Sequence, residues 1–305
     1  MAERFLITGA LGCIGAWCLE TLLSEGADVV AFDLGDDRHR LELIMEPDEL
    51  ARIEFVRGDV TSLDAVERAL DEHEVTNVIH LAALQVPFAA ADPPRGALVN
   101  VVGTVTLFEA VKRRLDRIPG LAYASSIAVY GQEDGTRVAE GAQGHPATHY
   151  GVYKQANEAT ARVYRRTDGV VSVGLRPFVV YGPGRDQGLT AAPTLAMQAA
   201  ARGEQYEIPF GGRVQMHYAP DTARAFVAAA RDPGEGAIVA NLGGPTVHVA
   251  EVARTIEAAA LGARVAFVDQ PLPFPEEFEG RFHPSPATPL ATGVRETIEL
   301  FRTRV

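Results

Sequence analysis

The first half of the chain alternates short apolar runs with longer stretches of helical periodicity. The apolar runs are rich in Val, Ile, Leu and Phe, which is typical of strands buried on both faces of a sheet. We predict strands at Arg4–Thr8, Asp28–Asp33, Ile53–Arg57, Asn77–Ala82 and Leu121–Ser125. The stretches between them predict helices at Ile14–Ser24, Leu63–His73 and Arg95–Arg114. This alternation predicts an α/β fold with a doubly wound parallel sheet.

The same rhythm continues to Arg176 and then weakens. A helix at His149–Thr167 and a strand at Val170–Leu175 complete the pattern. We therefore predict one larger unit over residues 1–176. Two segments, 177–212 and 246–305, are expected to form a smaller C-terminal lobe that binds substrate. Residues 213–245 are expected to return to the larger unit.

Finer features are expected inside these C-terminal segments. A helix is predicted near Pro193–Arg202, and Asp221 is expected to cap another that ends at Arg231. Ala237–Asn241 is predicted to add a strand to the sheet. The proline-rich run 271–289 is expected to be an extended wrap that leads to a last helix from Ala291.

Composition narrows the class of partner. The formal charge of −12 argues against nucleic acid, whose phosphates need a basic surface, and gives no support for an anionic membrane face. The chain enters an apolar strand almost at once, leaving no room for a signal peptide, and no apolar run approaches a bilayer span. Two cysteines suggest no disulfide framework, and eight histidines lack metal-ligand spacing. We expect a cytoplasmic protein without a metal.

A glycine-rich loop joins the first predicted strand to the first predicted helix. It reads Thr-Gly-Ala-Leu-Gly-Cys-Ile-Gly from Thr8 to Gly15. Its glycines allow a tight turn and a close backbone approach to a pyrophosphate, which the helix N-terminus then attracts. The candidate contacts are Gly9, Gly12, Cys13, Ile14 and Gly15. The loop therefore predicts a dinucleotide site.

Asp33 stands at the end of the second predicted strand, close to the spacing expected for a carboxylate that binds the ribose hydroxyls. A carboxylate there repels a 2′-phosphate and favours NAD. Because Arg38 and Arg40 follow and can meet such a phosphate, NADP is the alternative.

Tyr150 and Lys154 lie four residues apart, on one face of a predicted helix. A nearby ammonium group stabilises phenolate, so Lys154 is expected to bring the pKa of Tyr150 towards the working range of an acid–base catalyst. The chain has 28 basic residues, and only Lys112 and Lys154 are lysine. Unlike arginine, lysine can release its proton into a relay. An ordinary surface pair on a helix is the alternative interpretation.

Ser126 follows the fifth predicted strand, at the edge of a doubly wound sheet where ligands bind. Its hydroxyl is expected to hold the substrate oxygen beside the phenol of Tyr150. Ser125 competes for this role, and a strand-end cap is the other possibility. The chain lacks the Gly-x-Ser-x-Gly elbow of a serine hydrolase.

Taken together, these motifs resemble the extended short-chain dehydrogenase/reductases of the NAD-dependent epimerase/dehydratase family, which have a Rossmann fold. The resemblance covers nearly the whole chain and also rests on Asp59-Val60, His80–Ala83, Asn100–Thr104, Ser125–Gly131 and Arg176–Pro183. It implies a homodimer formed through the helices predicted at Arg95–Arg114 and His149–Thr167. It also implies an active-site role for Asn100 and cofactor contacts by Lys154, Tyr150, Asp59, Val60, Leu81, Ala82, Ala83, Phe178 and Val180.

Departures from the family pattern narrow the reaction. Dehydrating members carry acidic residues where this chain has Ile127 and Ala128, so a proton donor for water elimination is missing. Nucleotide-sugar epimerases usually have Asn at the position of Val179 and Arg at that of Val214, with Arg213 only adjacent. A diphosphate needs such charge-assisted donors, so a UDP-sugar is disfavoured. The candidate substrate contacts are Gln85, Ser126, Tyr150, Val179 and Arg185.

Three functions follow from these residues. The first is an NAD-dependent oxidoreductase that moves a hydride to or from a secondary carbinol of a sugar, polyol or sugar acid, with Tyr150 as acid and base. The second is a sugar or nucleotide-sugar epimerase that uses the same residues through a transient ketone. The third is a non-catalytic dinucleotide sensor, for which an intact set of Ser126, Tyr150 and Lys154 would be superfluous.

Overall fold

The computed structural model describes residues 3–283 and 287–304. At its centre lies a seven-stranded sheet in the order β11-β7-β5-β4-β1-β2-β3, in which every neighbouring pair is parallel. The prediction of a doubly wound parallel sheet is therefore confirmed. Its strands are β1 (Arg4–Thr8), β2 (Asp28–Asp33), β3 (Glu54–Arg57), β4 (Asn77–His80), β5 (Gly120–Ala124), β7 (Val171–Arg176) and β11 (Ala237–Asn241).

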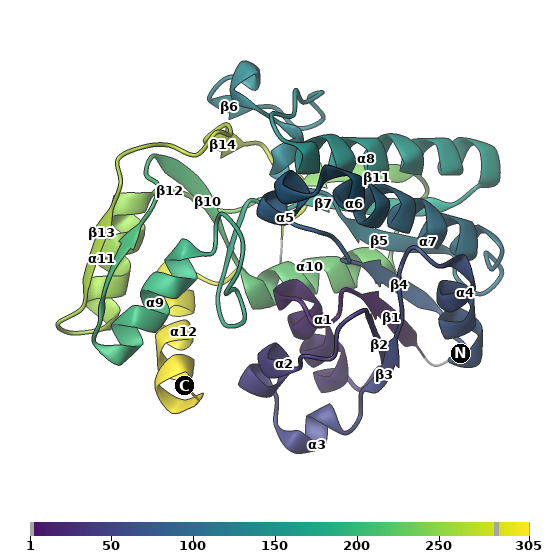
Figure 1. The fold of residues 1–305 in the computed structure, drawn as a ribbon, viewed down its shortest axis with the longest axis horizontal. Coiled ribbons are helices and arrows are strands. Elements are labelled where there is room, and N and C mark those ends of the chain that lie inside the picture. Colours follow the sequence, from purple (N-terminus) through teal and green to yellow (C-terminus); the bar gives the residue numbers. More distant parts are fainter. Residues whose placement is uncertain (1–2, 284–286, 305) are drawn as a thin grey trace.

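Helices cover both faces of this sheet because its strands are apolar on both faces (Figure 1). In β1, Phe5 and Ile7 pack into one core with α1 and α10, whereas Leu6 packs into a second core with α4 and α7. The first layer holds α1 (Cys13–Ser24), α2 (His39–Ile44), α3 (Pro47–Leu50) and α10 (Ala219–Arg231). The second holds α4 (Leu63–Glu72), α5 (Val86–Ala91), α6 (Pro93–Ala97), α7 (Gly103–Lys112) and α8 (His149–Asp168).

The single helix predicted at Arg95–Arg114 is interrupted. A π-helical turn, η1 (Leu98–Val102), joins α6 to α7, and Asn100 lies in this turn. Such turns are wider than an α-helical turn and occur frequently at functional sites. The apolar periodicity continues across the turn, which is why the sequence pattern did not reveal it.

A smaller lobe lies beside the sheet, on the left in Figure 1. Its core is built around a three-stranded sheet in the order β12-β10-β8. Its strands are β8 (Val179–Tyr181), β9 (Gln205–Ile208), β10 (Arg213–Tyr218), β12 (Thr246–His248) and β13 (Arg264–Phe267). Its helices are α9 (Ala192–Arg202), α11 (Val249–Ala259) and α12 (Leu290–Arg304).

Segment 213–245 is shared between the two parts. Helix α10 and strand β11 pack with the large sheet, whereas β10 pairs with β8 and β12 in the lobe. We therefore propose that the boundary of the returning segment falls at the end of β10 rather than at residue 213.

The C-terminal segment wraps back across the molecule. Its strand β14 (Glu277–Phe278) pairs with β6 (Arg137–Val138), and residues 284–286 of the predicted wrap lie outside the described residues. The prediction that Asp221 caps a helix is wrong, because α10 begins at Ala219 and its N-cap is Tyr218. Asp221 instead accepts hydrogen bonds from the backbone N–H and the hydroxyl of Thr288, at 2.6 and 2.8 Å. It thereby fastens the wrap to α10.

No helix within the described residues is long and apolar enough to cross a membrane.

Candidate active site

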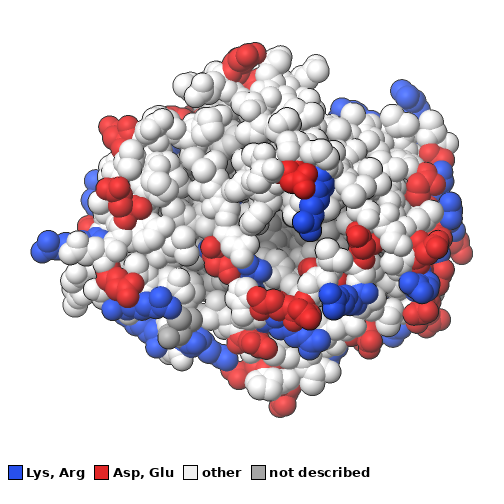
Figure 2. Space-filling view, in the orientation of Figure 1, with Lys and Arg blue, Asp and Glu red and all other residues white. Residues whose placement is uncertain are grey.

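A cleft of about 460 Å³ opens where the carboxyl ends of the central strands face the lobe. Figure 2 shows a hollow in the middle of this face, with acidic and basic side chains around its rim. Residues from the glycine loop, from the ends of β2, β4 and β5, from α8 and from the lobe line it together. This is the edge at which ligands bind in open α/β sheets.

The glycine loop forms one wall of the cleft. Gly9 has a φ of 67°, and a Cβ atom there would lie 2.7 Å from the backbone nitrogen of Ala82. A Cβ atom at Gly15 would lie 2.5 Å from the carbonyl oxygen of Gly9. Gly12 is the N-cap of α1, so no side chain at that position accepts hydrogen bonds from the first backbone N–H groups of the helix. The loop therefore presents free backbone donors to a pyrophosphate, and it fits a dinucleotide.

Asp33 lies in the same cleft, where β2 ends. Its carboxylate accepts hydrogen bonds from the backbone N–H groups of Leu11, at 3.0 Å, and Gly35, at 3.2 Å. These bonds fix the carboxylate beside the loop, where it can accept further bonds from ribose hydroxyls. Arg38 and Arg40, the two arginines that made NADP the alternative cofactor, have other partners. Arg40 pairs with Asp186 at 2.7 Å, and the guanidinium of Arg38 stacks 3.5 Å from the ring centre of Phe55.

The candidate cofactor residues as a whole divide into two groups. Nearly all of them line the cleft, namely Gly9, Gly12, Cys13, Ile14, Gly15, Asp33, Asp59, Val60, Leu81, Ala82, Ala83, Tyr150, Lys154, Phe178 and Val180. Asn100 does not line it and is buried behind the wall. Its side-chain amide donates to the carbonyl oxygens of Leu84 and Gly96, and its backbone carbonyl oxygen accepts from the side-chain amide of Asn157 at 2.9 Å. Asn100 therefore supports the loop after β4.

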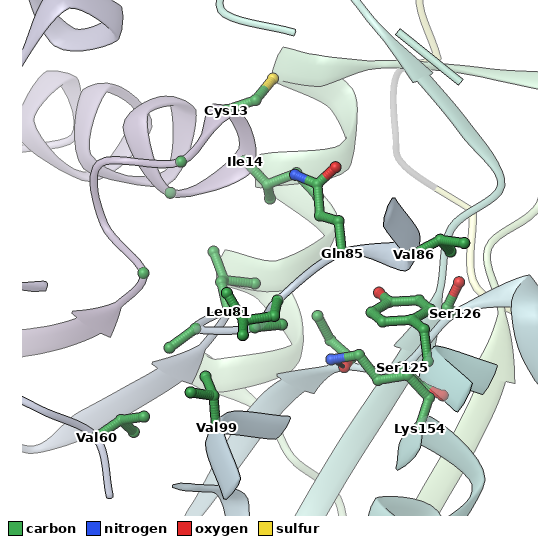
Figure 3. A pocket seen from close by; sticks show the side chains of 18 of the residues that line it. Cys13, Ile14, Val60, Leu81, Gln85, Val86, Val99, Ser125, Ser126 and Lys154 are labelled. Carbon is green, nitrogen blue, oxygen red and sulfur yellow. Dashed lines mark hydrogen bonds between the residues drawn. The ribbon is translucent and has the colours of Figure 1, made fainter. Parts of the chain in front are cut away.

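Ser126, Tyr150 and Lys154 meet in the cleft although two separate elements supply them. Ser126 follows β5, and its hydroxyl accepts from the N–H of Ala128 at 3.1 Å as the N-cap of η2 (Ile127–Val129). Tyr150 lies in the first turn of α8, and Lys154 lies one turn later. Figure 3 shows Ser126 and Lys154 on one side of the cavity, with Cys13 and Ile14 across from them.

The competing serine has another role. The hydroxyl of Ser125 donates to the carboxylate of Glu158 at 2.5 Å. The same carboxylate forms a buried, bidentate ion pair with Arg176, with both hydrogen bonds at 2.6 Å. Both serines line the cleft, but the hydroxyl of Ser125 is already bonded within this buried network, which leaves the hydroxyl of Ser126 for a substrate. Sequence reasoning missed Glu158, whose position four residues after Lys154 on the same helix face was the available signal.

Electrostatics around Tyr150 and Lys154 differ from expectation. Burial lowers the pKa of Lys154 to about 8, against the smaller opposing effect of Glu158. Burial raises the pKa of Tyr150, while its hydrogen bond with Ser126 and the charge of Arg185 oppose that rise. The expectation that Lys154 brings down this pKa is therefore wrong here. The ammonium donates to the carbonyl oxygen of Ala124 at 2.7 Å and lies 5.5 Å from the ring centre of Tyr150.

Some of the candidate substrate residues line the cleft and one does not. Gln85 and Arg185 line the cleft, but Val179 does not and is fully buried in the core of the lobe. Side chains alternate along a strand, so Val179 points away from the cleft while its neighbours Phe178 and Val180 face it. That alternation was a signal available from the sequence. Several further lining residues were missed, among them Val86, Leu189, Thr190 and Phe274.

Among residues 3–283 and 287–304, no group of three or more His, Cys, Asp or Glu side chains is arranged to hold a metal ion.

Comparison with known proteins identifies the family. A model of the "NAD dependent epimerase/dehydratase family" matches residues 5–243. The chain belongs to this family. It is accordingly an NAD-dependent enzyme, and the resemblance derived from the motifs, the Rossmann fold and NAD as cofactor are all confirmed.

Individual family members show how far the likeness extends. The chain is 30% identical to a UDP-glucose 4-epimerase of Mycolicibacterium smegmatis, with 99% of both chains covered. A Thermus thermophilus UDP-glucose 4-epimerase, solved in complex with NAD, is 26% identical, with a TM-score of 0.81 over 99% of this chain and 100% of that one. An L-threonine dehydrogenase of Clostridium difficile shares the fold at 21% identity, with a TM-score of 0.86 over 99% and 98%.

Proposed function

We propose that this family member is an oxidoreductase that exchanges a hydride between the nicotinamide of NAD and a secondary carbinol of a sugar, polyol or sugar acid. The observation that carries the proposal is the convergence of Ser126, Tyr150 and Lys154 in the cleft that also contains the glycine loop and Asp33. Bound NAD supplies the hydride acceptor or donor. The residues of the chain supply binding, orientation and proton transfer.

Each of the three residues has a distinct role in this proposal. The hydroxyl of Ser126 holds the substrate oxygen in place. The phenol of Tyr150 takes the proton from that oxygen during oxidation and returns it during reduction. Lys154, whose pKa burial lowers to about 8, passes the proton on through a relay. Water elimination is not supported, since Ile127 and Ala128 offer no carboxyl group for it.

The substrate proposed here lacks a nucleotide. Val179 and Val214 are both buried in the apolar core of the lobe and bring no donor to the cleft. Arg213, next to Val214, is half exposed and pairs with Glu277 at 3.3 Å. The positions of Val179 and Val214 therefore offer a diphosphate no charge-assisted donor.

Epimerisation is the second candidate. The likeness to a UDP-glucose 4-epimerase over the full length of both chains favours it. An epimerase would use the same three residues, with the ketone turning over in the cleft before it receives the hydride on its other face.

Product analysis separates the two candidates. We expect steady NADH formation, followed by absorbance, when the enzyme meets NAD and its substrate among unphosphorylated sugars, polyols and sugar acids. An epimerase would instead give a stereoisomer of the substrate, seen by chromatography, with no net NADH. Absence of NADH across a broad panel, together with an epimerised product, would replace the first proposal with the second.

We further propose a homodimer formed through α8 and the α6–η1–α7 segment. Val152 and Val163 lie on one face of α8, three turns apart, and each is nearly half exposed, as are Leu98 and Val102 of η1. Exposed apolar side chains on neighbouring helices are typical of a subunit interface. We expect Val163→Asp to convert a dimer to a monomer in light scattering, whereas the same mass for both proteins would contradict the dimer.

A further inference from the structure

Arg185 is a cation of the cleft wall without an acidic partner among the described residues. Its Nη2 donates to the hydroxyl of Thr190 at 3.1 Å, and its buried Nε has no hydrogen-bond partner. The neighbouring Asp186 does not neutralise it, because that carboxylate already pairs with Arg40 at 2.7 Å and His39 at 2.8 Å. A buried guanidinium nitrogen without a partner is costly unless a ligand satisfies it.

Gln85 approaches the same place from the opposite wall. A Cβ atom at Gly188 would lie 2.1 Å from Oε1 of Gln85 and 3.2 Å from Nη2 of Arg185. Gly188 has a φ of 99° and carries no side chain, so the loop can come this close to Gln85. An amide and a guanidinium thus border one small space, and Figure 3 shows Gln85 reaching into the cavity. The guanidinium of Arg185 is the donor suited to a small, planar anion, whereas Gln85 borders the space with its amide oxygen, an acceptor suited to a substrate hydroxyl.

The surroundings limit the size and charge of that anion. Beyond Arg185, the substrate side of the cleft is lined largely by apolar residues, including Val86, Phe178, Leu189 and Phe274. Arg185 and Tyr150 line the same cleft, so one substrate molecule has to reach both of them. A short molecule with one negative end meets both conditions.

We propose that Arg185, together with Thr190, binds a carboxylate of the substrate beside Gln85, and that the substrate is therefore a short sugar acid rather than a neutral sugar or polyol. This inference rests on the proposed oxidoreductase function and names its substrate class. A guanidinium donates two parallel hydrogen bonds to a carboxylate, which fixes the direction of the carbon chain as well as its affinity.

The first test measures substrate preference. The enzyme is assayed with NAD against four- to six-carbon sugar acids and the neutral alditols of the same chain length. We expect a kcat/KM at least about tenfold higher for the acids. Arg185→Met should remove that preference, mainly through KM. Arg202→Met is the matched control, because Arg202 is an exposed arginine at the end of α9, outside the cleft. It should keep the preference of the wild type.

The second test separates a substrate carboxylate from the phosphates of the cofactor. The charge of Arg185 also reaches Cys13 in the glycine loop, so a phosphate is the other source of an anion. Trp17 is the only tryptophan, and its Nε1 donates to the carbonyl oxygen of Pro183 at 2.9 Å, so we expect its fluorescence to respond when NAD binds beside α1. We expect Arg185→Met to keep the Kd for NAD within about twofold. A tenfold weaker Kd with an unchanged acid preference would overturn the proposal.

The third test distinguishes failure of this inference from failure of the proposed function. Binding of sugar acids to the NAD complex is measured by thermal shift, which needs no turnover. Stabilisation that depends on Arg185 supports the carboxylate site even if no substrate is oxidised, and in that case the proposed function fails. Oxidation of neutral alditols in preference to acids keeps the proposed function and refutes the carboxylate site. Neither binding nor oxidation refutes both.

Discussion

The two sides of the cleft are built in different ways. The cofactor side includes short turns that directly follow β1, β2 and β4, and the contacts we propose there are made by backbone N–H groups and by side chains such as Asp33 at fixed spacing. The substrate side combines Gln85, Thr190 and Phe274, which are far apart in the chain and come together only through the packing of the lobe. Local geometry determines the first side, whereas tertiary packing determines the second.

This difference explains how one family serves many substrates. A dinucleotide is always held by the same backbone arrangement, so the sequence must keep its glycines and its acidic residue. The lobe side can change one side chain at a time without disturbing the central sheet. The predictions below test whether the two sides are separable, beginning with the largest expected effect.

Replacement of Tyr150 by Phe should have the largest effect, because it removes the proton-transferring hydroxyl and leaves the ring in place. We expect kcat to fall by roughly 10³-fold or more, while the Kd for NAD, measured by Trp17 fluorescence, stays nearly unchanged. Tyr153→Phe on the same helix is the control, since the hydroxyl of Tyr153 donates to the carbonyl oxygen of Pro93 at 2.8 Å. Equal turnover by both variants would refute the catalytic role.

Replacement of Gly9 by Ala tests the cofactor side. Gly9 and Gly26 both have positive φ, but only at Gly9 would a Cβ atom collide with neighbouring backbone. Gly26→Ala should cost about 1 kcal/mol of unfolding free energy and leave NAD binding intact. Gly9→Ala should also displace the loop and weaken NAD binding by about 100-fold, an estimate based on the need for close backbone approach. Similar Kd values for the two variants would show that the close approach is unimportant.

Replacement of Asp33 by Asn should have a smaller effect, confined to cofactor choice. Loss of the charge removes the repulsion of a 2′-phosphate and weakens the bonds to the ribose hydroxyls. We expect the ratio of NAD to NADP affinity to fall by about tenfold, measured by fluorescence titration. Asp36→Asn, three residues later in an exposed turn, should leave the ratio unchanged.

Two buried histidines, one in each part of the molecule, should make stability depend on pH. Burial lowers the pKa of both His80 and His217 from 6.5 to about 3. Below pH 6.5 the unfolded chain takes up protons that the folded chain does not, so stability is lost as the pH falls from 6.5 towards 3. The slope should be about 1.4 kcal/mol per pH unit for each histidine.

Variants of these two histidines compare how much each contributes to stability at neutral pH, His80 in the large sheet and His217 in the lobe. His80 hydrogen-bonds to Thr8 at 2.7 Å and to Thr104 at 3.0 Å, whereas Nε2 of His217 has no partner. We expect His217→Met to reduce the acid slope with little loss at pH 7, and His80→Met to cost more at pH 7. Urea unfolding at several pH values provides the measurement, and equal losses for both variants would contradict this account.

The sequence predicted the cofactor side better than the substrate side for a physical reason. Gly9, Gly15 and Asp33 are required by local backbone geometry, and the order of strand, loop, helix and acid is visible in any short stretch. Val179 was misplaced because its position depends on which face of a three-residue strand turns to the lobe core. Thr190 and Phe274 belong to segments without periodicity, so no pattern indicated their place.

The pKa shifts of Tyr150 and Lys154 also could not be predicted from the sequence. The spacing of Tyr150 and Lys154 correctly indicated one helix face, but it did not reveal how deeply both side chains are buried. Burial raises the pKa of the phenol and lowers the pKa of the ammonium, and the carbonyl oxygen of Ala124 takes the ammonium as its partner. These effects arise from packing between β5 and α8, which residue spacing alone does not encode.

The π-helical turn η1 has a consequence for how this protein tolerates insertions and deletions. Each residue rotates an α-helix by about 100°, and η1 accommodates one residue more than an α-helical turn would. Removal of one residue from Leu98–Val102 would restore regular winding and turn α6 away from its present orientation. The carbonyl of Leu84 would then lose its amide donor from Asn100, and the loop after β4 would be left unsupported. Chain length at this point is therefore as constrained as residue identity.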